Sequence, residues 1–145
     1  MKKLLFALLF CASVSVQAQH NTVYGCLTPD TRGLGLGYAR TIHNFGIYGD
    51  FAQGKSRFDT KHWKYSIGAL IIPRQQNTGY KFQFGMGLSY NAYSGKSDSD
   101  LFDTSKLKTL DFEPGCGAVI NRKFYAGLSY GVLNNFATLK CGLKF

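Results

Sequence analysis

The chain has 145 residues, enough for one domain, with 17 Lys and Arg against 8 Asp and Glu. Its four cysteines are scattered, which excludes a regular disulfide framework and a metal motif. No nucleic-acid-binding motif accompanies the basic charge, so we expect no nucleic-acid partner. After the first 18 residues, no apolar run reaches the ~20 residues that a membrane-spanning helix needs.

The first 18 residues have the three parts of a secretory signal peptide. Residues 1–3 are a basic start, residues 4–16 are mostly apolar, and Val16 and Ala18 place short side chains before the cleavage point. We therefore predict a cleaved signal peptide at 1–18 and a mature domain at 19–145. The alternative is a buried N-terminal helix, which the three-part pattern does not favour.

Apolar and polar side chains alternate along most of the mature chain, which is typical of β-strands with one apolar face. In residues 80–92, for example, Phe84 and Leu88 alternate with Gly85 and Gly87. The pattern predicts a weak first strand, whose faces are unclear, and seven further strands. In chain order these eight strands are residues 22–28, 34–42, 45–51, 63–71, 80–92, 109–120, 123–132 and 136–145.

The links between the predicted strands alternate in length. Tight turns at 43–44 and 121–122 and a medium link at 73–79 contrast with long links at 53–62 and 94–108. Short turns at one end and longer loops at the other are typical of outer-membrane barrels. The first and last links are shorter than this pattern predicts.

Two features favour a membrane barrel over a soluble, lipocalin-like barrel that buries its apolar face. Glycines gather on the polar face, where they make room inside a narrow barrel. Aromatic residues lie near both strand ends, as in the two interfacial girdles of a membrane barrel. The polar-face glycines are Gly35, Gly37, Gly46, Gly68, Gly85, Gly87, Gly115, Gly117, Gly127, Gly131 and Gly142. The girdle residues are Phe45, Tyr80, Phe82, Phe124 and Phe145 on the turn side, and Phe51, Trp63, Tyr65 and Tyr90 on the loop side.

The last predicted strand ends on an aromatic residue. Leu139, Cys141, Leu143 and Phe145 share its apolar face. Most soluble domains end in frayed polar residues, so this ending also favours a membrane barrel. We predict an all-β, closed, antiparallel, up-and-down transmembrane β-barrel of about eight strands. Pro114 does not fit a closed ladder, and we expect a bulge or a break at that position.

With its signal peptide, alternating strands and terminal Leu143 and Phe145, the chain resembles small outer-membrane β-barrel proteins of the OmpX and opacity-protein type, with a porin-superfamily barrel domain. The resemblance covers the whole mature chain and implies a monomer in the cell outer membrane, in contact with lipid and lipopolysaccharide. It also implies that the barrel assembly machinery reads the terminal strand through Leu143 and Phe145. Members of this group are surface proteins, adhesins, small channels or proteins of unknown role.

Charged residues on the predicted polar faces are candidates for the lumen. They form either a polar pore with a ligand site or a packed network of ion pairs. About eight strands leave an interior just wide enough for side chains, which favours ion pairs. The candidates are Asp50, Lys64, Lys81, Asp111, Glu113, Lys140 and Lys144.

The predicted link at 53–62 is basic, with Lys55, Arg57, Lys61 and His62 against a single acidic residue. Such a cluster binds lipopolysaccharide phosphates or an acidic surface partner, or it is only a solvated loop tip. Both interpretations place these side chains outside the membrane.

Catalysis needs a nucleophile, a base and an orienting group within reach of one another. Ser56, Asp59 and His62 share one predicted external loop but match no lipase or deacylase motif, so a solvated loop histidine explains His62. We therefore expect no enzyme, no catalytic residue, no metal and no cofactor. A structural or surface-interaction role through the external loops is the first hypothesis. A narrow, porin-like small-solute channel is the second, and a lipid-modifying enzyme is the third.

Overall fold

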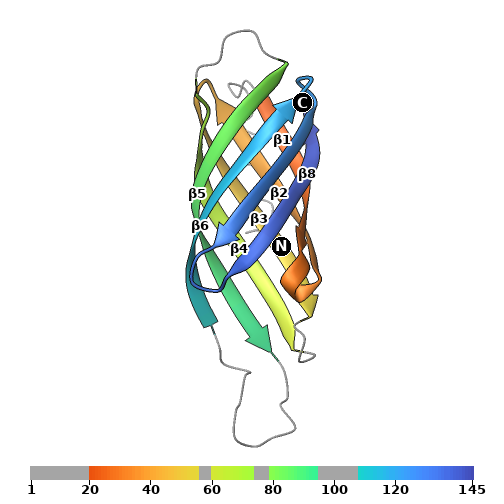
Figure 1. Ribbon diagram of the computed structural model, residues 1–145, viewed down its shortest axis with the longest axis vertical. Coiled ribbons are helices and arrows are strands. Elements are labelled where there is room, and N and C mark those ends of the chain that lie inside the picture. The colour runs from red at the N-terminus through yellow and green to blue at the C-terminus, as the bar shows by residue number, and fades with distance from the viewer. Residues whose placement is uncertain (1–19, 56–59, 74–78, 95–107) are drawn as a thin grey trace, which may run out of the picture.

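The computed structural model describes residues 20–55, 60–73, 79–94 and 108–145. The predicted signal peptide lies outside these residues, so its cleavage stays a prediction. Within the described part of the chain, no helix is long and apolar enough to cross a membrane. The elements are β1 (His20–Thr28), the 3-10 helix η2 (Pro29–Thr31), β2 (Gly33–Ile42), β3 (Phe45–Lys55), β4 (Lys61–Ile71), β5 (Tyr80–Ser94), β6 (Lys108–Ile120), β7 (Phe124–Gly131) and β8 (Phe136–Lys144) (Figure 1).

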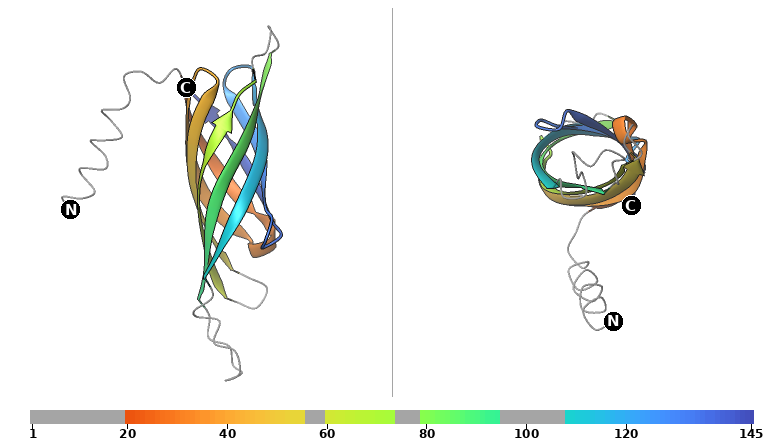
Figure 2. Two further views of the ribbon diagram at one scale, coloured as in Figure 1. Left: turned by 90° about the vertical axis from the view of Figure 1, so that its left-hand side faces the viewer. Right: turned by 90° about the horizontal axis from the view of Figure 1, so that it is seen from below.

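The eight strands form a closed barrel in which each strand pairs antiparallel with its neighbours in sequence. Pairing of β1 with β8, with Thr22 opposite Lys144, closes the ring that Figure 2 shows from below. The predicted closed, antiparallel, up-and-down barrel is therefore confirmed. The weak first strand is a full member, and Tyr24, Cys26 and Thr28 on one of its faces are buried.

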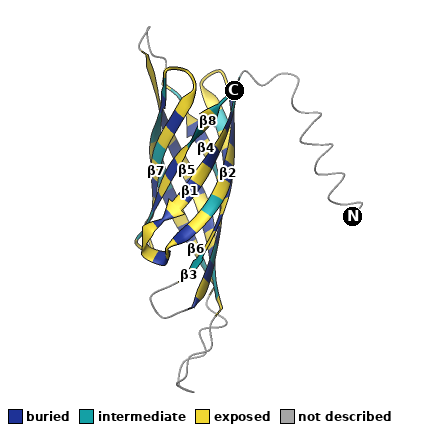
Figure 3. Cartoon of the chain, turned by 90° about the vertical axis from the view of Figure 1, so that its right-hand side faces the viewer, coloured by how far each residue is buried: buried dark blue, intermediate teal, exposed yellow. Residues whose placement is uncertain are grey.

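Burial alternates along most of each strand, because successive side chains of a strand point to opposite sides of the wall (Figure 3). Arg40 in β2 is an exception, since it is buried between the buried Ala39 and Thr41. In β5, Ser89 and Asn91 are buried while Phe84 and Leu88 are exposed. The predicted polar faces therefore line the lumen, and the apolar faces form the outer surface. The inward side chains fill the lumen, because the interior of an eight-stranded barrel is only wide enough for side chains.

Glycines on the inward face make room for tyrosines that cross the lumen. A Cβ atom on Gly37 would lie 2.2 Å from the Tyr24 ring, and one on Gly87 would lie 2.3 Å from the Tyr48 hydroxyl. Both distances are shorter than any real contact between these atoms. The glycines of the polar face therefore leave the space that the large inward side chains fill.

The two ends of the barrel differ, and we call them the turn end and the loop end. The turn end carries the links 43–44, 72–79 and 121–123, and it also holds His20 and Phe145. The loop end carries η2 and the links 56–60, 95–107 and 132–135. Because β3 ends at Lys55 and β4 begins at Lys61, the link 56–60 is shorter than the predicted link 53–62.

The aromatic residues predicted for the two girdles all lie on the outer face. Those at the turn end are exposed, and so are Phe51, Tyr65 and Tyr90 near the loop end, where Trp63 is half-buried. The rings of Phe51 and Tyr65 lie 5.0 Å apart, across the β3–β4 ladder. Two bands of aromatic residues thus flank an apolar wall.

Pro114 lies inside β6, and the strand continues through it. The ladder with β5 runs through it, with Met86 opposite, whereas the ladder with β7 stops at Gly115. The Val132 amide donates to the Phe112 carbonyl at 3.0 Å, in the same register as the pairs beyond Gly115. The expected bulge or break is therefore wrong, and a gap in one ladder is sufficient because proline has no N–H to donate.

Candidate functional site

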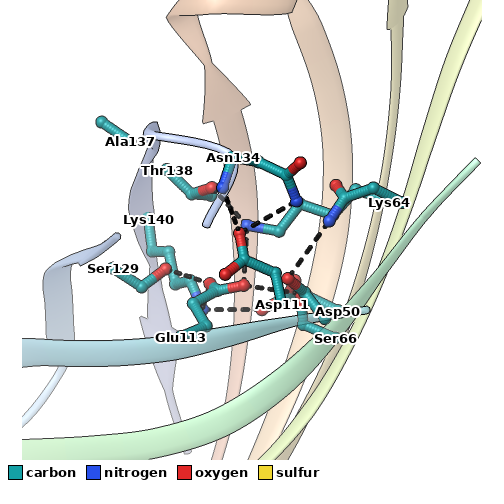
Figure 4. Close-up of polar contacts among 12 residues, drawn as sticks. Asp50, Lys64, Ser66, Asp111, Glu113, Ser129, Asn134, Ala137, Thr138 and Lys140 are labelled. Atoms are coloured by element: carbon teal, nitrogen blue, oxygen red, sulfur yellow. Dashed lines mark hydrogen bonds and ion pairs between the residues drawn. The ribbon is translucent and has the colours of Figure 1, made fainter. Parts of the chain in front are cut away.

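Four of the seven charged residues predicted for the lumen meet in one buried cluster, which we call the lumen ion-pair cluster (Figure 4). Lys64 Nζ lies 2.8 Å from Glu113 Oε2, and Lys140 Nζ lies 2.7 Å from Asp50 Oδ2. Lys140 also approaches Glu113 Oε1 at 3.6 Å. The four side chains come from β3, β4, β6 and β8, so they connect opposite sides of the ring.

Hydroxyl groups complete the surroundings of Glu113 and Lys64. Ser66 donates to Glu113 Oε2 at 3.0 Å, and Ser129 donates to Glu113 Oε1. Lys64 donates to Thr138 Oγ1 at 2.6 Å. A buried charge is costly unless it is both paired and hydrogen-bonded, and this pair meets both conditions.

Tyrosines surround the second ion pair. The Tyr24 hydroxyl donates to Asp50 Oδ2 at 3.2 Å, and Lys140 Nζ lies 4.5 Å from the centroid of the Tyr48 ring. The Tyr24 ring also packs on Tyr125 at 5.4 Å. Within the described residues, Asp50 Oδ1 is buried without a hydrogen-bond partner. A cavity of about 20 Å³ beside Tyr24 and Tyr48 has room for about one water.

The other three predicted lumen residues lie outside the cluster. Asp111 is buried nearer the loop end, where it accepts the Leu133 amide at 2.8 Å and the Asn134 amide at 3.1 Å. It therefore fixes the link between β7 and β8. Lys81 is exposed and Lys144 is half-buried, because both lie at the turn end and beyond the depth of the ion pairs.

The predicted external basic loop is not a single loop in the structure. Lys55 ends β3, Lys61 begins β4, and the two are opposite each other in the ladder. Both are exposed, whereas Arg57 lies outside the described residues. His62 points into the lumen and belongs to neither loop nor surface.

The interpretation of His62 as a solvated loop histidine is wrong. Its side chain is 1 % exposed, and its Nε2 lies 3.0 Å from Asn91 Oδ1. Its ring stacks on Tyr93 at 4.7 Å and meets the edge of Phe136 at 5.6 Å. Extending the alternation one residue back from the outward Trp63 would have placed His62 in the lumen.

Sequence analysis missed Tyr24, because the faces of the first strand were unclear. Tyr24 is paired with the inward Gly37 in the β1–β2 ladder. If the register of these two strands had been known, this pairing would have indicated that Tyr24 faces the lumen. Ser56 and Asp59, which share a predicted loop with His62, lie outside the described residues. Among the described residues, no three His, Cys, Asp or Glu side chains are placed to hold a metal ion.

No protein-family model matches the sequence, and no curated protein matches it. Solved structures do match the fold. The N-terminal β-barrel domain of Pseudomonas aeruginosa OprF has a TM-score of 0.63 and 15 % identity, over 87 % of this chain and 96 % of that one. The Yersinia pestis outer membrane protein Ail, in a phospholipid bilayer nanodisc, has a TM-score of 0.52 and 18 % identity, over 88 % of this chain and 99 % of that one.

At these identities the comparisons establish the fold, and they agree with the resemblance drawn from the sequence. The chain has the fold of the small eight-stranded outer-membrane β-barrels. Its interior combines a buried ion-pair cluster with tyrosines and glycines, and its outer face is apolar.

Proposed function

We propose that the chain is an integral outer-membrane β-barrel protein with a structural or surface-interaction role through its external loops. The observation that carries this proposal is the apolar outer wall of a closed barrel. Leu36 and Ile67, each 70 % exposed, belong to a band of large apolar side chains around the barrel. A soluble protein rarely exposes such a surface, whereas lipid tails would cover it.

The interior supports the same proposal. A soluble ligand-binding barrel buries apolar side chains, but the buried residues here include Lys64, Glu113, Asp50 and Lys140. Fixed ion pairs across the ring stabilise a wall whose outer face gains nothing from the hydrophobic effect in lipid. The lumen therefore serves as the polar core of the molecule.

The filled lumen supports a structural role in preference to the channel. The ion-pair cluster and the tyrosines around it occupy the middle of the described lumen, and the cavity beside Tyr24 and Tyr48 measures about 20 Å³. We propose no enzyme activity, because the buried His62 is hydrogen-bonded to the Asn91 side chain and not to a serine or cysteine that it could activate.

We propose that the turn end faces the periplasm and the loop end faces outward, as short turns and longer loops do in such barrels. Lys55 and Lys61 are exposed at the loop end, so lipopolysaccharide phosphates are the partner that their charge fits. We further propose that the protein is a monomer, that export follows cleavage after Ala18, and that the assembly machinery reads Leu143 and Phe145.

Fractionation with a heat-modifiability gel tests this proposal. The full chain should be recovered in the outer-membrane fraction and resist extraction by alkaline carbonate. Its mobility on the gel should differ before and after boiling. Recovery as a carbonate-soluble periplasmic protein would contradict the proposal. Mass spectrometry of lipid A from the same cells tests the enzyme hypothesis, and we expect no modification that depends on the protein.

A further inference from the structure

The charges at the turn end of the barrel have one sign. The described basic residues of this rim are Arg40, Lys81, Arg122, Lys123 and Lys144, with His20 and His43 beside them. The acidic side chains lie elsewhere: Asp50, Asp111 and Glu113 in the lumen, and Asp30 at the loop end. The remaining four acidic residues fall in the segments 56–59 and 95–107, which connect strands at the loop end. Among the described residues, the turn end therefore has no acidic side chain.

The rim lysines form a continuous arc. The Lys144 amide donates to the Lys123 carbonyl at 2.7 Å, which joins β8 to the turn between β6 and β7. In that turn Asn121 and Arg122 have left-handed φ values of 50° and 61°, the geometry of a tight hairpin turn. This conformation leaves Arg122 and Lys123 exposed. Lys81 and Lys144 both have inward parity near the turn ends of β5 and β8, so their like charges point towards the same mouth of the barrel.

This rim contrasts with the lumen ion-pair cluster, where each ammonium group has a carboxylate. At the rim, like charges are gathered without acidic side chains between them, so an anion would relieve their repulsion. Arg40, near the turn end of β2, is a buried basic residue of the same rim. Its side chain is 8 % exposed, and its Nε is buried without a hydrogen-bond partner in the described part of the chain.

Aromatic neighbours point to lipid as the source of the anion. Three rim lysines are each adjacent in sequence to an exposed, outward aromatic residue of the turn-end girdle. These pairs are Lys81 with Tyr80, Lys123 with Phe124, and Lys144 with Phe145. Aromatic side chains of a membrane barrel settle at the interface, so the lysines beside them in sequence lie at the depth of the headgroups. Lys81 and Lys144 have inward parity and reach this depth at the mouth of the lumen, whereas Arg122 and Lys123 lie in the exposed turn outside it. A site for a soluble anion would not need this belt.

We propose that the turn-end rim binds the phosphate groups of anionic phospholipids in the periplasmic leaflet of the membrane. This inference rests on the proposed function, because it takes the turn end to be the periplasmic one. Several Lys and Arg residues at one headgroup level attract anionic lipid additively, and salt screens the attraction. The rim would fix the depth of the barrel and collect anionic lipid around it.

The experiment measures lipid preference of the full mature barrel by native mass spectrometry in detergent, titrated with phosphatidylglycerol or phosphatidylcholine. We expect phosphatidylglycerol to bind about tenfold or more tightly than phosphatidylcholine. The variant K81Q/R122Q/K123Q/K144Q should lose that preference. The loop-end control R32Q/K108Q removes two exposed charges that have no proposed lipid contact and should keep it, whereas R122Q/K123Q, which removes two exposed charges at the rim, should weaken it.

Three results would overturn the proposal. They are equal binding of both lipids by the unaltered protein, an equal loss in the loop-end control, or full competition by inorganic phosphate at the lipid concentration. Retention on purified peptidoglycan that depends on the rim, without any lipid preference, would also overturn it. The heat-modifiability gel, run on every sample, shows separately whether a barrel has formed, so failure of the proposed function is distinguishable. If the fourfold variant does not fold, the exposed single variant R122Q and the loss of preference at high salt give the same test.

Discussion

Lys64 and Glu113 face each other across the lumen, with Nζ and Oε2 2.8 Å apart on side chains that are 2 % and 0 % exposed. The two residues lie on β4 and β6, which are not neighbours in the ring. The pair therefore braces the barrel across its interior, where no backbone hydrogen bond reaches.

Removing one partner of this pair should destabilise the barrel strongly. Glu113→Gln leaves the Lys64 ammonium without its main carboxylate, and a broken buried pair typically costs ~3–5 kcal/mol. The urea midpoint of the heat-modifiable form measures the loss. Lys61→Gln, at the exposed end of the same β4 strand, is the control and should change stability by less than ~0.5 kcal/mol. An unchanged urea midpoint for Glu113→Gln would show that the pair contributes nothing.

The lipid face should reject charge according to depth. Leu88 is mid-strand in β5 and 48 % exposed on the outer wall, so Leu88→Arg should cost ~2–4 kcal/mol. Gln53 is exposed on the same outer face near the loop end of β3, where Arg should cost ~0–1 kcal/mol. Folding yields into lipid vesicles compare the two variants. Equal yields would contradict the placement of this wall in a bilayer.

Inward glycines should not tolerate a methyl group. A Cβ atom on Gly87 would lie 2.3 Å from the Tyr48 hydroxyl and 2.6 Å from the Ile67 carbonyl oxygen, so Gly87→Ala should cost ~1–3 kcal/mol. Gly25 faces outward, and the nearest atom to its added Cβ lies 3.8 Å away. Gly25→Ala should therefore be almost neutral in the same urea titration. A reversed order of the two variants would mean that the face assignment is wrong.

The faces of seven of the eight strands were predictable from sequence because they depend only on a period of two, whereas those of β1 were not. Phe84 and Leu88 mark the outer face of β5 whatever their neighbours are. His62 was misplaced because the predicted strand began at Trp63, whereas β4 begins at Lys61, and polar lumen residues near a mouth resemble loop residues. Alternation of apolar and polar residues therefore predicts the face of a residue least reliably at the ends of strands.

The ion pairs were not predictable to the same degree. All four lysines of the predicted lumen have inward parity, so the sequence pattern does not distinguish between them: Lys64, Lys81, Lys140 and Lys144. Which of them meets a carboxylate depends on depth along the barrel and on the register between strands that are far apart in sequence. Lys140 lies at the same depth in the barrel as Asp50 and Glu113. Lys144 lies four residues further along β8, towards the turn end.

The purified protein should show little or no conductance in planar bilayers. The lumen ion-pair cluster closes the middle of the described interior, and Lys140 is held by both Asp50 and Glu113. Single-channel recording of the full mature barrel measures this directly. A steady, large and reproducible conductance would instead favour the small-solute channel over the structural role.

Phe145 should matter more for assembly in the cell than for the stability of the finished barrel. Its amide donates to the Asn21 carbonyl at 2.8 Å and its carbonyl accepts the Asn21 amide at 2.8 Å, so its backbone helps to close β8 on β1. Deletion would remove both these bonds and the ring. Phe145→Ala keeps the backbone and removes only an exposed aromatic side chain. We therefore expect Phe145→Ala to refold into lipid vesicles with an unchanged urea midpoint.

In cells, the same Phe145→Ala variant should yield less heat-modifiable barrel in the outer membrane and more of a protease-sensitive periplasmic form. Phe82→Ala is the matched control, because Phe82 is also an exposed aromatic residue of the turn-end girdle but lies in β5. It removes a similar interfacial ring without touching the terminal strand, so its assembled level should stay close to normal. Equal losses in the two variants would assign the effect to the girdle and remove the terminal signal from the argument. Normal assembly of both would show that neither ring is needed in the cell.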